Sequence, residues 1–323
     1  MHSSRMNTDE LPKTAIEAIR YFADPDKCHD FAVAMRWPDG VRCAHCESEN
    51  IGALVKVGKR RLWNCKACKK QFTVKVKSIF EDSPLGLEKW LPALWMIVNA
   101  KNGISSCELG RALGVTQRTA WFMGHRIRAS MHNGIFNLSG HVEADETYIG
   151  GKARNMHAAK RREKIKGTGG TGKTAVQGLL ERTAGNKASR VQLKVVKTTK
   201  RAELQGNVRK YVLKGSEVST DALKSYSGLA EDFTHQVVDH AVEYVRGNVH
   251  TNGLENFWSL LKRTVKGTYV RPEPFHLFRY LDEQAFRFNE RKDENGDQGR
   301  FLTVMKSVAG RRLTYKALTA TES

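Results

Sequence analysis

The fold is decided by a segment that begins at His141 and reads HVEADETYIGGK. Its apolar residues Val142 and Ala144 alternate with polar ones, a period of two that predicts a β-strand. His141, Glu143 and Asp145 would share the opposite face of that strand. Acids on a buried strand protonate or destabilise the fold unless they are paired, whereas a divalent cation favours their ionised form. The strand is therefore a candidate for one side of a metal site.

The segments that follow predict a sheet with helices. Further strands are predicted over 174–185, 191–199 and 217–221, and a helix over 201–212. Asp221 would end the last strand, at the edge where open α/β sheets usually place their chemistry. Aspartate is also common at strand ends and turns. Considered alone, Asp221 is more simply explained as a solvated residue at the start of a loop.

A third acid lies on a predicted helix that begins after Asn252. The apolar face of this helix consists of Leu254, Phe257, Trp258 and Leu261. Glu255 and Lys262 are seven residues apart, close to two turns, so they share a face on which the lysine could hold a phosphate near a carboxylate-bound metal. An ordinary surface acid and base explain the pair equally well. The polar residues at 250–252 favour a site, because they add hydrogen-bonding and coordinating groups.

Two Cys-x-x-Cys pairs precede these segments. Cys43 and Cys46 are separated from Cys65 and Cys68 by 18 residues, a spacing typical of a four-cysteine zinc ribbon. Residues 37–80 contain too few apolar groups to fold by burial alone, so zinc binding would supply the folding free energy. A redox pair or a chance arrangement is the alternative. A disulfide framework is disfavoured because thiols stay reduced in the cytoplasm.

Between the cysteines and the acidic strand lies a helix-turn-helix pattern. A helix is predicted over 106–113, then a turn at Gly114 and Val115, then a second helix capped by Thr116. The second helix would present to DNA the residues Gln117, Arg118, Arg126 and Arg128. An ordinary helical hairpin inside a core would show the same short pattern.

The charge of the chain favours a polyanionic partner. Lys and Arg number 54 against 34 Asp and Glu, a formal net charge of +20. A merely soluble basic protein is the alternative. No apolar run approaches the roughly 18 residues of a membrane-spanning helix, and the start, MHSSRMNTDELPK, lacks a signal-peptide core. We therefore expect a cytoplasmic protein that does not contact membranes.

One competing motif is GTGGTGKT at 167–174, which satisfies the phosphate-loop pattern G-x-x-x-x-G-K-S/T. That pattern requires a hydrophobic strand before it and a helix after it. Here a basic segment precedes the motif and a strand-like segment follows it. We therefore expect a basic loop near DNA and no nucleotide cofactor.

These segments together resemble the zinc-ribbon DDE transposases of bacterial insertion sequences, the group related to eukaryotic Merlin transposons. The resemblance covers nearly the whole chain and rests, in the family's order, on the two CxxC pairs and on EADETYIGGK, TDALKSY, HTNGLENFWSLLKR and LDEQAFRFNER. It implies an α/β fold: an RNase H-like mixed sheet with flanking helices, preceded by a four-cysteine zinc ribbon and a helix-turn-helix.

The resemblance also implies the chemistry. Two catalytic Mg²⁺ or Mn²⁺ ions would be held, beside Lys262, by Asp145, Asp221 and Glu255. Glu143 and Glu146 flank Asp145, so the choice of Asp145 depends on the motif alignment. The implied reaction is hydrolysis at the ends of a mobile element, followed by attack of the exposed 3′ hydroxyls on target DNA. The implied partners are double-stranded DNA, as terminal inverted repeats and as target, and further copies of the chain on paired ends.

The predicted domains follow the motifs in order. They are an N-terminal helical segment (1–36), the zinc ribbon (37–80), the helix-turn-helix region (84–131), the RNase H-like catalytic domain (139–291) and a basic C-terminal tail (292–323). The alternative function is that of a DNA-binding regulator or domesticated relative that has lost catalysis. The presence of all three acids favours the enzyme.

Overall fold

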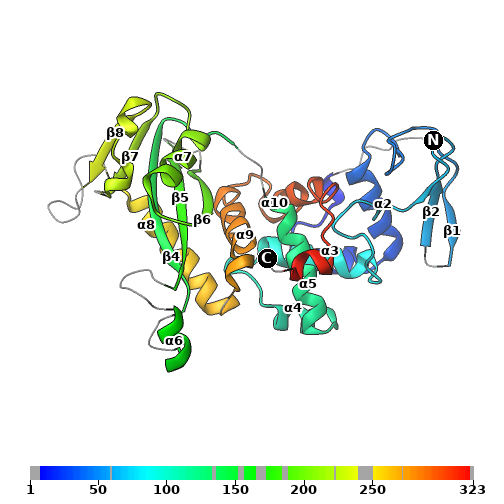
Figure 1. Ribbon diagram of the computed structural model, residues 1–323. Helices are drawn as coiled ribbons and strands as arrows, with labels where there is room; N and C mark the ends of the chain where they lie inside the picture. Colours follow the sequence, from blue (N-terminus) through cyan, green and yellow to red (C-terminus); the bar gives the residue numbers. More distant parts are fainter. Residues whose placement is uncertain are drawn as a thin grey trace. The chain divides into compact units, whose positions relative to one another are not determined.

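The computed structural model describes residues 8–58, 60–132, 136–151, 156–164, 172–183, 188–221, 223–238, 250–270 and 272–320 (Figure 1). The chain divides into two compact units. One, here called the ribbon unit, combines Met1–Met131 with Asp293–Ser323. The other, the sheet unit, is His132–Lys292.

The sheet unit is built on a five-stranded mixed sheet (Figure 1). Its strands are β4 (His141–Ile149), β5 (Thr174–Arg182), β6 (Arg190–Val196), β7 (Glu217–Asp221) and β8 (Thr234–Val238). They lie in the order β6-β5-β4-β7-β8; β5 runs antiparallel to both β4 and β6, whereas β7 pairs parallel with β4 and with β8. Numbered within the unit, this is the order 3-2-1-4-5 of an RNase H-like sheet, which confirms the predicted fold class.

Helices cover both faces of the sheet. They are α7 (Arg201–Tyr211), α8 (Asn252–Thr264), which continues into a π-helical turn (Val265–Tyr269), and α9 (Leu277–Asn289). The unit also contains the short helix α6 (Ala158–Lys164). Val142 and Ala144 pack in a cluster with α7, whereas α8 and α9 pack in a second cluster with residues such as Val176. The predicted alternation in β4 is therefore confirmed: Val142 and Ala144 face α7, and Asp145 and Glu143 bond to α8.

The ribbon unit holds a small sheet and a group of helices. The strands are β1 (Val55–Val57), β2 (Arg60–Asn64) and β3 (Gln71–Phe72), and the helices are α1 (Ala15–Tyr21), α2 (Pro25–Arg36), α3 (Leu87–Asn99), α4 (Ser106–Leu113), α5 (Gln117–Ser130), α10 (Gly296–Lys306) and α11 (Tyr315–Thr319). The predicted helix-turn-helix pair is present as α4 and α5, with Gly114 in the left-handed region at φ 64° between them. Ser105 and Thr116 cap the two helices through their side chains.

The C-terminal segment differs from the basic tail expected over 292–323. Phe301, Val304 and Met305 are buried, and their spacing of three and four residues gives α10 an apolar stripe. The ring of Phe301 lies 5.1 Å from that of Trp95 in α3 and 5.6 Å from that of Phe31 in α2. The segment is therefore part of the core of the ribbon unit. Among the described residues, no helix combines the length and apolarity needed to cross a membrane.

Candidate catalytic site in the sheet unit

The pairing of strands β4 and β7 brings two of the predicted acids together. Ala144 pairs with Thr220 in parallel register, and each is followed by one of the acids. Asp145 and Asp221 therefore come next to each other on neighbouring strands. The short β7 ends at Asp221, whereas β4 continues to Ile149. The two acids thus stand where the sheet opens beside the end of β7.

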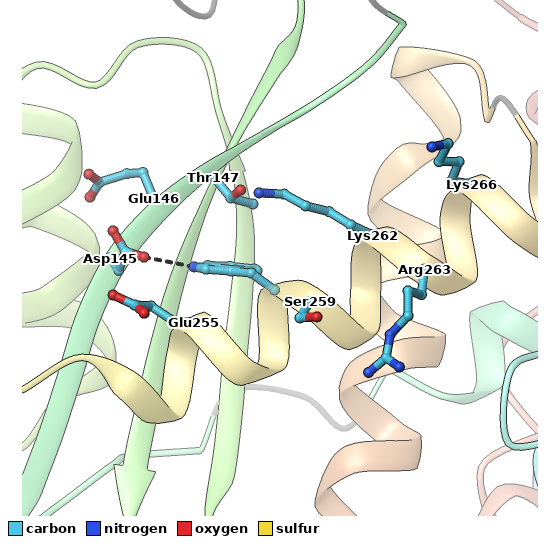
Figure 2. Close-up of a pocket in the computed structure, with 9 residues that line it drawn as sticks. Asp145, Glu146, Thr147, Glu255, Ser259, Lys262, Arg263 and Lys266 are labelled. Carbon is cyan, nitrogen blue, oxygen red and sulfur yellow. Dashed lines mark hydrogen bonds between the residues drawn. The ribbon is translucent and has the colours of Figure 1, made fainter.

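Helix α8 brings the third acid, Glu255, into a cavity that Asp145 also lines; Asp221 is not among its lining residues. The cavity is lined by Asp145, Glu146, Thr147, Glu255, Trp258, Ser259, Lys262, Arg263 and Lys266. In Figure 2 the carboxylate of Glu255 lies beside that of Asp145, and Lys262 extends from α8 toward Thr147. The predicted sharing of one helix face by Glu255 and Lys262 is therefore confirmed. Acids line one part of the cavity, and the basic residues that follow along α8 line the other.

The acids of this cavity influence one another. Burial raises the pKa of Asp145, and the nearby carboxylates of Asp221 and Glu255 raise it further. Burial, with the charges of Asp145 and Asp221, also raises the pKa of Glu146 to about 8. Burial is the larger cause of both shifts, and the neighbouring carboxylates add to it because like charges disfavour each other's ionised forms. A divalent cation would neutralise part of this negative charge.

The acids are spaced more widely than the cysteines. Within the part of the chain that the structure describes, the four cysteines are the one group of three or more His, Cys, Asp or Glu side chains gathered within 4.8 Å. Two ions about 3.5 to 4 Å apart would bind a wider set of hard oxygen ligands, completed by water and phosphate.

The four predicted cysteines form a second metal site, in the ribbon unit. The Sγ atoms of Cys43 and Cys68 are 3.7 Å apart, as are those of Cys46 and Cys65. A tetrahedral zinc ion with Zn–S bonds of about 2.3 Å places its sulfur ligands about 3.8 Å apart. The donor set and its geometry therefore fit structural zinc, as predicted.

Both units match known protein families. Residues 137–289 match the ISXO2-like transposase domain, and residues 23–71 match the transposase zinc-ribbon domain. The chain is also 26% identical over 257 residues to a Halobacterium salinarum protein described as an uncharacterized protein in transposable element ISH50, an alignment that spans 76% of this chain and 84% of that protein. These findings confirm the resemblance to zinc-ribbon transposases of insertion sequences.

A tryptophan holds Asp145 of the transposase domain, a contact that the sequence did not predict. The indole Nε1–H of Trp258 donates to Oδ2 of Asp145 at 2.8 Å and lowers the pKa that burial raises. Gly178 pairs with Asp145 across β4 and β5. A Cβ atom on Gly178 would lie 2.6 Å from the Trp258 ring, so only glycine leaves room for it. The glycine inside a strand was the available signal, because it often marks a close approach.

The structure distinguishes Asp145 from the two glutamates that flank it. Glu143 is fully buried, and its oxygens accept from Arg182 Nε at 2.5 Å and from the backbone N–H of Leu254 at 2.8 Å. Glu146 lines the cavity but accepts a hydrogen bond from the Tyr226 hydroxyl. Asp145 is the acid of the three whose carboxylate neighbours that of Glu255 (Figure 2).

The predicted DNA contacts in α5 are divided between exposed and buried residues. Gln117 and Arg118 are exposed at the start of the helix. Arg126 and Arg128 are buried, so the prediction that they contact DNA is wrong. Nine residues make about two and a half turns, so Arg126 projects opposite Gln117. Its guanidinium lies 5.2 Å from the centre of the Trp90 ring, and burial lowers its pKa to about 10.

The phosphate-loop motif does not have the required structural context. Most of it, residues 167–171, lies outside the described residues. Its last residue, Thr174, begins strand β5, whereas a phosphate loop is followed by a helix. The prediction that the segment holds no nucleotide stays a prediction.

Proposed function

We propose that this transposase cuts and joins DNA at the acidic end of the cavity, with Asp145, Asp221 and Glu255 as the metal ligands. The observation that supports the proposal most is that the register of β4 and β7 places Asp145 beside Asp221, while Asp145 and Glu255 of α8 line one cavity. Acids from three separate elements gathered at one place mark a candidate functional site.

The donor set determines which metals suit the site. Three carboxylates are hard oxygen ligands, which favour Mg²⁺ or Mn²⁺. When bound, two such ions would activate the attacking oxygen and stabilise the leaving one in an in-line displacement of phosphate.

The basic residues of α8 and of the π-helical turn after it would contact the DNA substrate. Lys262 shares the cavity with the acids, and Arg263 and Lys266 extend the positive charge away from them (Figure 2). Their charges would offset those of DNA phosphates on either side of the scissile bond. The substrate class is therefore double-stranded DNA whose backbone passes along α8.

The complete reaction requires recognition of the element ends as well as chemistry. We assign end recognition to the ribbon unit, with Gln117 and Arg118 of α5 as contacts. Hydrolysis at the terminal inverted repeats would expose 3′ hydroxyls, and these would attack target DNA. Further copies of the chain would act together on the two paired ends.

The replacement Asp221→Asn tests the catalytic proposal. It removes one ligand charge while keeping the side-chain shape, so cleavage of DNA that carries the terminal repeats should be abolished in Mg²⁺ or Mn²⁺, with end binding unchanged. Glu231→Gln, an exposed acid of the same unit, is the matched control and should cleave normally. Retained cleavage by Asp221→Asn would contradict the assignment. Binding without cleavage by the wild-type chain would favour the alternative, a DNA-binding regulator.

A further inference from the structure

The carboxylate of Glu143 lies at the start of the helix that carries Glu255. Glu143 is 0% exposed and stands two residues before Asp145, on the same face of β4. Its Oε2 accepts the backbone N–H of Leu254, which is in the first turn of α8, at 2.8 Å. The first N–H groups of a helix have no partner within the helix and attract negative charge, so this bond joins strand and helix at a fixed point.

The surroundings of Glu143 are built around this contact. Oε1 accepts from Arg182 Nε at 2.5 Å, and Arg182 also donates to the carbonyl of His250, just before α8. A Cβ atom on Gly253 would lie 2.8 Å from Oε1 of Glu143. Glycine at that position therefore lets the helix begin against the carboxylate. Strand β5, strand β4 and the start of α8 are thus connected through one buried ion pair.

We propose that Glu143 is a positioning residue for the catalytic metal site: it sets where Glu255 stands relative to Asp145, without binding metal itself. Leu254, which it holds, is the residue immediately before Glu255. Both oxygens of Glu143 are already occupied by protein donors. The inference rests on the proposed function, because it assumes that Asp145 and Glu255 share metal ions.

A second buried acid provides the matched control. Glu181 in β5 is 5% exposed and accepts from the Ser139 backbone at 2.9 Å and from Arg190 Nε at 2.7 Å. Like Glu143 it is a buried, paired acid of the same sheet. Its hydrogen bonds go to the start of β4 and to β6, so its replacement tests the loss of a buried ion pair that does not hold α8.

The test is Mn²⁺ binding by the zinc-loaded full chain, measured by electron paramagnetic resonance of the free ion. In Glu143→Gln the amide has one acceptor oxygen, so either Arg182 or the Leu254 N–H loses its partner. We expect the dissociation constant for Mn²⁺ to rise by about 10- to 100-fold, the usual cost of losing a group that orients metal ligands. Glu181→Gln should stay within about 2-fold of wild type, because its partners do not reach the site.

Gly253→Ala keeps the proposal testable if Glu143→Gln fails to fold. Alanine favours a helix, so this variant keeps every proposed ligand and does not weaken α8 intrinsically. Its methyl group would displace the start of α8 from Glu143, and Mn²⁺ binding should weaken.

Asp221→Asn separates the proposed metal site from the proposed positioning role of Glu143. If it binds Mn²⁺ as wild type does, the metal site itself is wrong. If it loses Mn²⁺ while the folded Glu143→Gln or Gly253→Ala variant matches Glu181→Gln, the positioning role alone is overturned.

Discussion

Single residues decide how Asp145 is held. The Trp258 ring lies against Gly178, and its N–H reaches the carboxylate. Trp258→Phe keeps an aromatic ring but removes the donor, so the carboxylate loses one orienting bond. We expect the cleavage rate to fall by about 10-fold, with DNA binding unchanged.

The matched control for this prediction is Trp95→Phe in the ribbon unit. Among the described residues, the buried Nε1 of Trp95 has no hydrogen-bond partner. Removing it should therefore leave cleavage near the wild-type rate. The cleavage rate is measured at saturating DNA. An unchanged rate for Trp258→Phe would show that the Trp258 N–H does not orient Asp145 for catalysis.

At this scale the sequence indicated the ligands better than their supports. Strand alternation and helix phase, which are local patterns, indicated the faces that carry Asp145 and Glu255, whereas the choice of Asp145 over Glu143 and Glu146 came from the family resemblance. Trp258 and Asp145 are 113 residues apart, and Glu143 and Leu254 are 111 apart. No local pattern encodes contacts over such distances. The acidic face of β4 predicted one cation, yet Glu143 is compensated by Arg182 and a helix start instead.

Among the elements, α5 carries the proposed DNA-reading function. Arg118 is exposed, and its Nη2 donates to the Tyr315 hydroxyl of α11 at 2.6 Å, which holds the guanidinium at the start of the helix. Arg118→Ala should weaken binding to the terminal repeat by about 10-fold or more, because a bidentate arginine contact is worth about 1 to 3 kcal/mol.

Fluorescence anisotropy against repeat and scrambled DNA measures this effect. Arg20→Ala removes the same charge from an exposed position on α1 and is the control. If the two variants lose affinity equally on both DNAs, net charge alone explains binding and α5 does not read the sequence.

Periodic elements were predicted well, and short or late ones were missed. The helix-turn-helix boundaries followed from Ser105, Gly114 and Thr116, whose capping and turn roles are local. Strand β8 (Thr234–Val238) was not predicted. Helix α9 packs through the buried Leu277 and Leu281, whereas Phe278 is 44% exposed. In α10 the apolar spacing of Phe301, Val304 and Met305 is a local signal of a helix.

For the whole molecule, the division into two units predicts separable losses. Removing zinc with a chelator, or by Cys65→Ser, should unfold the ribbon, whose four sulfurs are set for one ion. Binding to the terminal repeat should be lost. The sheet unit has its own hydrophobic clusters, so it should keep its Mn²⁺ affinity.

Circular dichroism and Mn²⁺ titration of the Cys65→Ser variant test this separation. Cys28→Ser is the control, because Cys28 is a buried cysteine outside the four-cysteine group. Loss of Mn²⁺ binding together with zinc would show that the two units do not fold independently.

Fold class and order of motifs could be predicted from the sequence. The packing of the C-terminal segment in the ribbon unit could not, because it depends on contacts such as Phe301 with Trp95.

The most direct test of the central claim is anomalous X-ray diffraction from crystals of the zinc-loaded chain soaked in Mn²⁺. We expect two manganese peaks about 3.5 to 4 Å apart, bonded to carboxylate oxygens of Asp145, Asp221 and Glu255. Manganese held elsewhere, or bonded to Glu143 or Glu146 in place of Asp145, would contradict it.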